Sequence, residues 1–118
     1  MTSITHAPAA SPSVAVMTAE ELAAFAKRLT TLPIAPGERR IVLGHLQEAM
    51  QHLFDAALAV SIGLAEDGPD AEEARDAAHE AALAASVTRD RFSEAVASIE
   101  DMEQDALVSA GAQDGGQA

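Results

Sequence analysis

Three residues with metal-ligand chemistry, His45, Glu48 and His52, are spaced three and four residues apart. This spacing places their side chains on one face of a helix, where imidazole nitrogens and carboxylate oxygens can bind a metal ion. However, His45 and His52 lie two turns apart, about 10 Å along a helix axis, which is too far for both to bind the same ion. A second helix would have to supply further ligands, and Asp76 with His79 is the matching pair.

These two sets of candidate ligands do not lie at the same level in the helical arrangement that the rest of the sequence predicts. A di-metal site between helices requires the ligands of both helices to lie at the same height along the bundle, so only a dimer would bring the two sets together. We therefore expect exposed histidines, with no metal or other cofactor. A metal-binding helical bundle is the second of two alternatives to the function predicted below.

The composition argues against several other classes of function. The 118 residues include 19 acidic and 7 basic side chains, which gives a net charge of −12, and there is no Cys, Trp or Tyr. Without cysteine there is no thiolate nucleophile and no thiolate metal ligand. Direct nucleic-acid binding relies on Lys and Arg and is disfavoured. Because no nucleophile, phosphate-binding or zinc-protease motif occurs either, we expect a protein that is not an enzyme and has no catalytic residues.

The sequence also bears on location. No apolar run approaches the ~18 residues that a membrane-spanning helix needs. Residues 1–16 contain neither a basic leader nor a long apolar core, so a signal peptide is not expected. We therefore predict a cytoplasmic protein, and export by a route independent of a signal peptide stays open.

The central part of the chain has the periodicity of helices throughout. Residues 1–16 are predicted to be a disordered arm and residues 111–118 a disordered tail, because both are rich in small, polar, Pro or Gly residues. The helical domain between them, 17–110, is expected to contain helices over about 18–31, 38–66 and 70–110. Thr18 and Glu21 form a candidate capping box for the first helix.

Each of the two longer helices carries an apolar seam at alternating spacings of three and four, typical of a coiled coil. The turn Asp67-Gly68-Pro69-Asp70 joins them, which predicts an antiparallel hairpin. The seam residues are Leu43, Leu46, Met50, Leu53, Ala57, Val60 and Leu64 on one helix, and Ala74, Ala78, Ala81, Ala85, Thr88, Phe92, Ala95, Ile99, Met102 and Ala106 on the other.

Further contacts complete the predicted three-helix, bundle-like fold. The short first helix is expected to cover the end of the third helix, around Ile99 and Met102. Four basic residues are then expected near five acidic ones of that end: Lys27, Arg28, Arg39 and Arg40 near Glu94, Glu100, Asp101, Glu103 and Asp105. The glycines within the second helix, Gly44 and Gly63, suggest close contact between helices, since glycine otherwise costs ~1 kcal/mol there.

A second apolar stripe lies outside the seams. Its members are Phe54, Leu58, Ile62, Leu83 and Val87. Because the hairpin alone does not bury both stripes, we predict that these residues bind a protein partner or a second copy of the chain, in an adaptor, chaperone or secretion-associated role. The first alternative is an acidic inhibitor that mimics nucleic acid and blocks a basic site on its partner.

The layout of residues 38–110, an acidic, alanine-rich hairpin, resembles that of small helical hairpins of specialised bacterial secretion systems. One such family has a Trp-X-Gly turn. The turn in this chain contains no Trp. The resemblance therefore covers layout alone, and no residue roles follow from it.

Overall fold

The protein is all-α, as predicted, in a computed structural model that describes residues 13–117 and the side chains of 13–111. The helices are α1 (Val14–Leu29), α2 (Arg39–Ala65) and α3 (Glu72–Gln117), and the described residues include no strand. Short 3-10 helices, η2 (Pro36–Glu38) and η3 (Pro69–Ala71), precede α2 and α3. The chain divides into two units, Met1–Ile34 and Ala35–Ala118, and each is described by itself.

The first unit contains α1, which begins four residues earlier than predicted. Its N-cap is Ser13, whose hydroxyl accepts a hydrogen bond from the Val16 N–H at 3.2 Å. The Thr18 hydroxyl, predicted to cap the helix, instead donates to the Val14 carbonyl at 2.7 Å. Ser13 satisfies a free N–H as well as threonine would, and the alanine- and valine-containing segment after it continues the helix. The predicted disorder is therefore wrong at 14–16, and residues 1–12 lie outside the described part.

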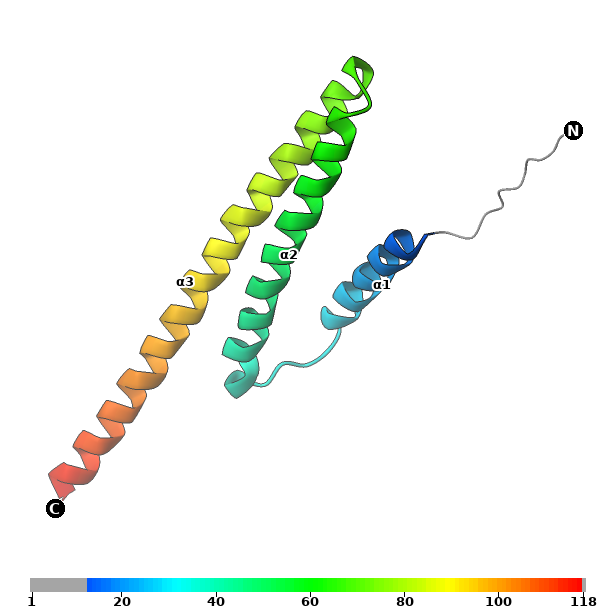
Figure 1. Ribbon diagram of the computed structural model, residues 1–118. Helices are drawn as coiled ribbons and strands as arrows, with labels where there is room; N and C mark the ends of the chain where they lie inside the picture. The colour runs from blue at the N-terminus through cyan, green and yellow to red at the C-terminus, as the bar shows by residue number, and fades with distance from the viewer. Residues whose placement is uncertain (1–12, 118) are drawn as a thin grey trace, which may run out of the picture. The chain divides into compact units, whose positions relative to one another are not determined.

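The second unit is the predicted antiparallel hairpin, in which α2 and α3 lie side by side along the length of α2 (Figure 1). Glu38 fixes the start of α2: its carboxylate accepts from the Ala35 N–H at 3.1 Å, and its own N–H donates to the Ala35 carbonyl at 2.9 Å. At the other end the turn reverses the chain at Gly68, whose φ of 93° is readily adopted only by glycine. Pro69 then starts η3, the position that its fixed φ favours.

The two most deeply buried residues of the contact between α2 and α3 are small, which lets the helices approach closely there. Ala82 is fully buried, and Ser61 is 5% exposed. The predicted seam is therefore only partly correct, because Val60 is exposed at 58% and Ala74 and Ala81 are exposed as well. At Val60 and Ala81 the buried position lies one residue further along the helix than predicted, whereas the alternate seam positions are half-buried as expected: Leu43, Met50, Ala57 and Leu64 on α2, and Ala78, Ala85, Phe92 and Ile99 on α3. Ser61 tolerates burial because its hydroxyl donates to the Arg75 carbonyl of α3 at 3.2 Å.

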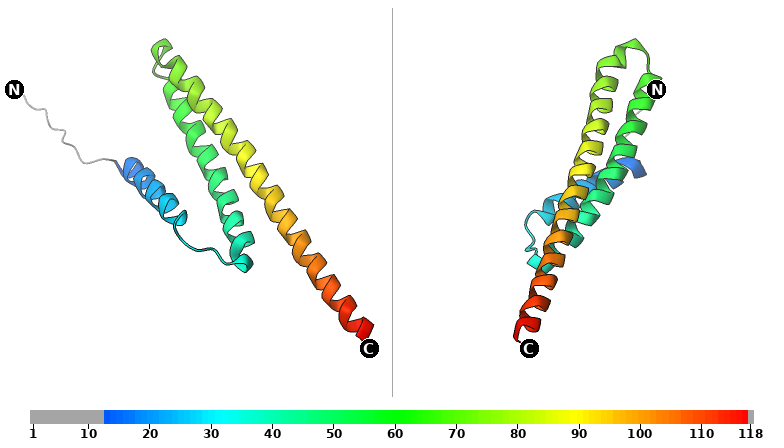
Figure 2. Two further views of the ribbon diagram at one scale, coloured as in Figure 1. Left: turned by 180° about the vertical axis from the view of Figure 1, so that it is seen from behind. Right: turned by 90° about the vertical axis from the view of Figure 1, so that its left-hand side faces the viewer.

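α3 extends beyond the level at which α2 begins, as the two views of Figure 2 also show. The helix runs to Gln117 rather than ending at about 110, and Ala118 lies outside the described part. The disorder of the tail stays a prediction. Glycine lowers helix propensity but keeps its backbone N–H, and no proline interrupts this stretch. Met102 and Leu107 are exposed on this extension. The covering of this end by α1 stays a prediction.

The glycines within α2 do not mark close contact between helices. A Cβ atom built on Gly44 or Gly63 would meet nothing within 4 Å, so that prediction is wrong. The cost of a helical glycine is therefore not offset by packing at either position.

Alanine at Gly44 is accordingly expected to stabilise the hairpin by about 0.5–1 kcal/mol, because alanine orders the helix at lower entropic cost. Thermal unfolding followed by circular dichroism at 222 nm measures the change. An unchanged or lower Tm would show that the open space beside Gly44 is filled in solution.

Candidate interaction surfaces

The five residues predicted to bind a partner differ in their exposure. Phe54 and Leu58 are half-buried. In contrast, Ile62, Leu83 and Val87 are exposed at 57%, 51% and 59%. Burial of these three side chains in a contact would remove substantial apolar surface from water, at about 25 cal/mol per Å². Their role in binding stays a prediction.

A shallow hollow of about 410 Å³ lies on the side of the hairpin that carries Ile62. One wall is formed by α2 and is mainly apolar, and the other is formed by α3 and is polar. The lining residues are Leu58, Ser61, Ile62 and Ala65 of α2, with Arg75, Asp76 and His79 of α3. Leu83 and Val87 follow His79 at intervals of four residues and continue this side along α3. We call the side of Leu58, Ile62, Asp76, His79 and Leu83 the groove face.

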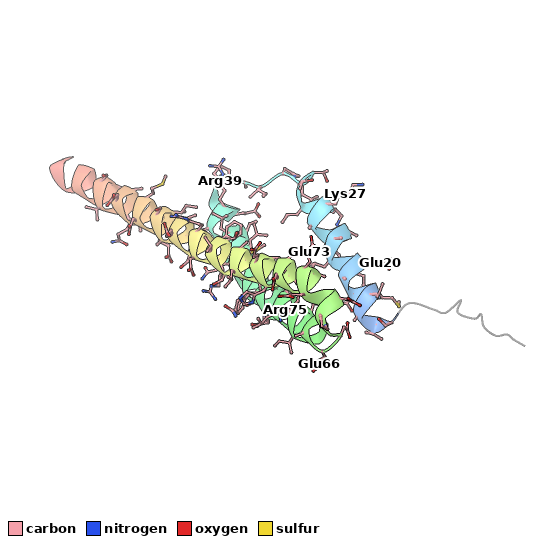
Figure 3. All side chains as sticks on the ribbon, turned by 90° about the horizontal axis from the view of Figure 1, so that it is seen from above. Glu20, Lys27, Arg39, Glu66, Glu73 and Arg75 are labelled. Atoms are coloured by element: carbon pink, nitrogen blue, oxygen red, sulfur yellow. The ribbon has the colours of Figure 1, made fainter. Side chains whose placement is uncertain are left out.

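Polar side chains lie along the groove face, and one contact between them joins α2 to α3. Arg89 of α3 donates to the Gln51 side chain of α2, and also to Asp90 at 3.0 Å. Nearer the turn, Arg75 pairs with Asp76 at 3.0 Å. Figure 3 shows Arg75 near the turn end of the hairpin. These contacts are partly exposed and contribute little stability each, but they mark this face as polar.

The opposite side of the hairpin has a different character. Adjacent residues of a helix are about 100° apart, so residues that follow the buried ones lie on one side and residues that precede them lie on the other. Ile62 follows Ser61 and lines the hollow. Val60 and Ala81, which precede Ser61 and Ala82, therefore share the side away from the hollow.

This second side, which we call the uncharged face, has no charged residue along most of α2. It consists of two rows: Val42, Leu46, Leu53 and Val60 on α2, and Ala74, Ala81, Thr88 and Ala95 on α3. Val60, Ala74 and Ala81 are exposed, and the others are half-buried. Arg91 lies at the margin, where it pairs with Glu94 at 3.1 Å. All residues of the two rows except Val42 belong to the seam that the sequence predicts between the helices, although their lack of charge is visible in the sequence.

The candidate metal ligands do not form a site within the chain. His45, His52 and His79 are all exposed, as is Glu48. Within the described part, no three His, Cys, Asp or Glu residues are grouped so that they could hold a metal ion. The metal-binding alternative therefore has no supporting geometry in a single copy.

The predicted pairing across the far end of the hairpin is confirmed for Arg40. Its Nε atom lies 3.1 Å from the Glu103 Oε1 atom. Both side chains are about half exposed, so the pair aligns the helices more than it stabilises them.

At the turn end, acidic residues of η3 and α3 line a second open hollow of about 580 Å³: Asp70, Glu72, Glu73, Asp76 and Glu80.

Comparison of the chain with family models, with curated proteins and with solved structures finds no match in any of the three. The fold and the surfaces above therefore rest on this chain's own residues. Among the described residues, no helix combines the length and the apolar character that crossing a membrane requires.

Proposed function

We propose that the chain is a non-enzymatic protein-interaction module, of adaptor or chaperone type, which acts through the groove face. The observation that carries this proposal is the exposure of Ile62 and Leu83 beside a hollow that has one apolar wall and one polar wall, which includes Asp76. Such a surface suits an amphipathic segment of another protein that carries apolar anchors flanked by basic residues. The net charge of −12 would increase the rate of association with a basic segment.

Capture of binding proteins from an extract of the source cells tests this proposal. A variant with Ile62→Glu and Leu83→Glu should lose the proteins that the wild type retains, because two carboxylates would be buried against the partner's apolar anchors. The matched control is Leu107→Glu, which replaces an exposed leucine on the extension of α3. Identical proteins bound by the wild type and the double variant would contradict the use of the groove face.

The acidic turn end favours a second candidate, an inhibitor that occupies the basic site of a nucleic-acid-binding protein. Five carboxylates lie around one open hollow there. Binding of this kind should weaken steeply with salt, as nucleic-acid binding does. Binding by apolar anchors on the groove face should change much less, so titration of any captured partner with salt distinguishes the two candidates.

A further inference from the structure

The uncharged face differs from the rest of the surface in its lack of charge. Each chain carries a net charge of −12, so two copies repel one another when their acidic surfaces meet. A contact through the groove face would remove Asp55, Asp76 and Asp90 from water, the last two together with the arginines that pair with them. Between Val42 and Val60, α2 contributes no charged residue to the uncharged face, and Arg91 at its margin is paired with Glu94.

The two rows of this face are complementary in size. In a two-fold symmetric contact, each copy presents the same surface to the other. The row of leucine and valine on α2 can then pack over the row of small residues on α3 of the other copy, with the large side chains filling the space beside alanine. Thr88 adds no unsatisfied group, because its hydroxyl already donates to the Ala84 carbonyl at 2.8 Å.

The size of the face also matches a stable interface. With 27 residues, α2 is about 40 Å long. Two helices packed 8–10 Å apart present a surface about 20 Å wide. One copy would therefore bury about 800 Å², which is the amount per partner in an interface of standard size.

From charge, shape and area we infer that the uncharged face is the contact between two copies of this chain, which together form an antiparallel four-helix bundle. This contact encloses Leu46 and Leu53, which the single hairpin leaves half-buried. It uses the side opposite the groove face, so both groove faces stay accessible in the dimer. The inference is therefore independent of the function proposed above.

Light scattering coupled to size-exclusion chromatography of the full chain tests the inference with two matched pairs of variants. The wild type should have twice the 12.1 kDa mass of one chain. Val60→Glu and Ala81→Glu should weaken the dimer by roughly tenfold or more, because the symmetric contact would bury each new carboxylate twice. The controls are Ile62→Glu and Leu83→Glu, each two residues away on the same helix and on the groove face, and they should leave the dimer intact.

Circular dichroism of each variant monitors folding. Val60 and Ala81 are both exposed in the hairpin, so glutamate should leave the helix content unchanged.

A wild-type mass of one chain would overturn the inference. A dimer that is weakened by Ile62→Glu and Leu83→Glu but not by the first pair would also overturn it. Neither result depends on the capture of another protein, so failure here is distinct from failure of the groove-face proposal.

Discussion

Replacement of Ala82 by leucine should lower the free energy of unfolding by about 1–3 kcal/mol, the usual cost of overpacking a filled contact. Ala82 has no exposed surface, and Ser61 is almost as completely buried. A side chain with three more carbon atoms at this position has to separate the helices or adopt a strained rotamer. For a domain of this size the loss corresponds to a fall in Tm of roughly 5–20 °C.

Ala97→Leu is the matched control, because Ala97 is an exposed alanine of the same helix. Its free energy of unfolding should change by no more than about 0.5 kcal/mol, as for ordinary surface substitutions, so its Tm should stay close to that of the wild type. Both variants are compared with the wild type by thermal unfolding at one protein concentration. Equal Tm values for Ala82→Leu and Ala97→Leu would contradict the close approach of α2 and α3.

The sequence was sufficient to predict the hairpin because several independent signals agreed. Apolar residues recur at helical spacing on both sides of the turn, and Gly68 with Pro69 provides the conformations that the turn needs. The short turn also determines which residues of the two antiparallel helices lie opposite one another, and the hydrogen bond between Ser61 and Arg75 agrees with this pairing. The pairing of Arg40 with Glu103 confirmed the expected end of the hairpin.

The rotation of the helices was not predicted, because α2 is apolar over a wide arc. The seam that includes Val60 and the stripe that includes Leu58 lie on either side of Ser61, so hydrophobicity alone has no single maximum there. The structure buries the small, polar Ser61 between them. Its hydroxyl reaches the Arg75 carbonyl, and the alanines of α3 permit close packing. Patterns of hydrophobicity count serine as polar and therefore place the contact one residue away.

Because the rotation of the helices was not predicted, the exposure of the candidate binding residues was predicted only in part. Ile62, Leu83 and Val87 are exposed as expected, whereas Phe54 and Leu58 are half-buried. The uncharged face was missed because a seam assigned to the interior was not considered as surface. The uncharged face can be recognised only once the buried residues are known, and the packing of α2 on α3 determines which residues those are.

The second large effect that we expect is a dependence of the Tm on protein concentration, because the hairpin has little interior of its own. Within the described part, Ala82 is the one fully enclosed apolar side chain, and no large side chain is completely buried. A hairpin with so little interior gains only part of its stability from the contact between α2 and α3, since apolar burial is the main favourable term in folding. Association with a second copy would supply further burial, so folding and association should be coupled.

Coupled folding and association make the Tm depend on protein concentration. A hundredfold increase in concentration should add about 2.7 kcal/mol to the apparent stability, by mass action. For a dimer of this size, that corresponds to a rise in Tm of roughly 5–10 °C. The Val60→Glu variant, in which the contact between copies is weakened, should have a lower Tm than the wild type at the same concentration.

Thermal unfolding of the wild-type chain over a hundredfold range of concentration therefore tests most directly whether the hairpin needs a second copy to complete its interior. A Tm that rises by several degrees, together with a lower Tm for Val60→Glu at each concentration, is the predicted result. A cooperative transition of the wild type at the same Tm throughout the range would show that one hairpin is sufficient, and would contradict the account.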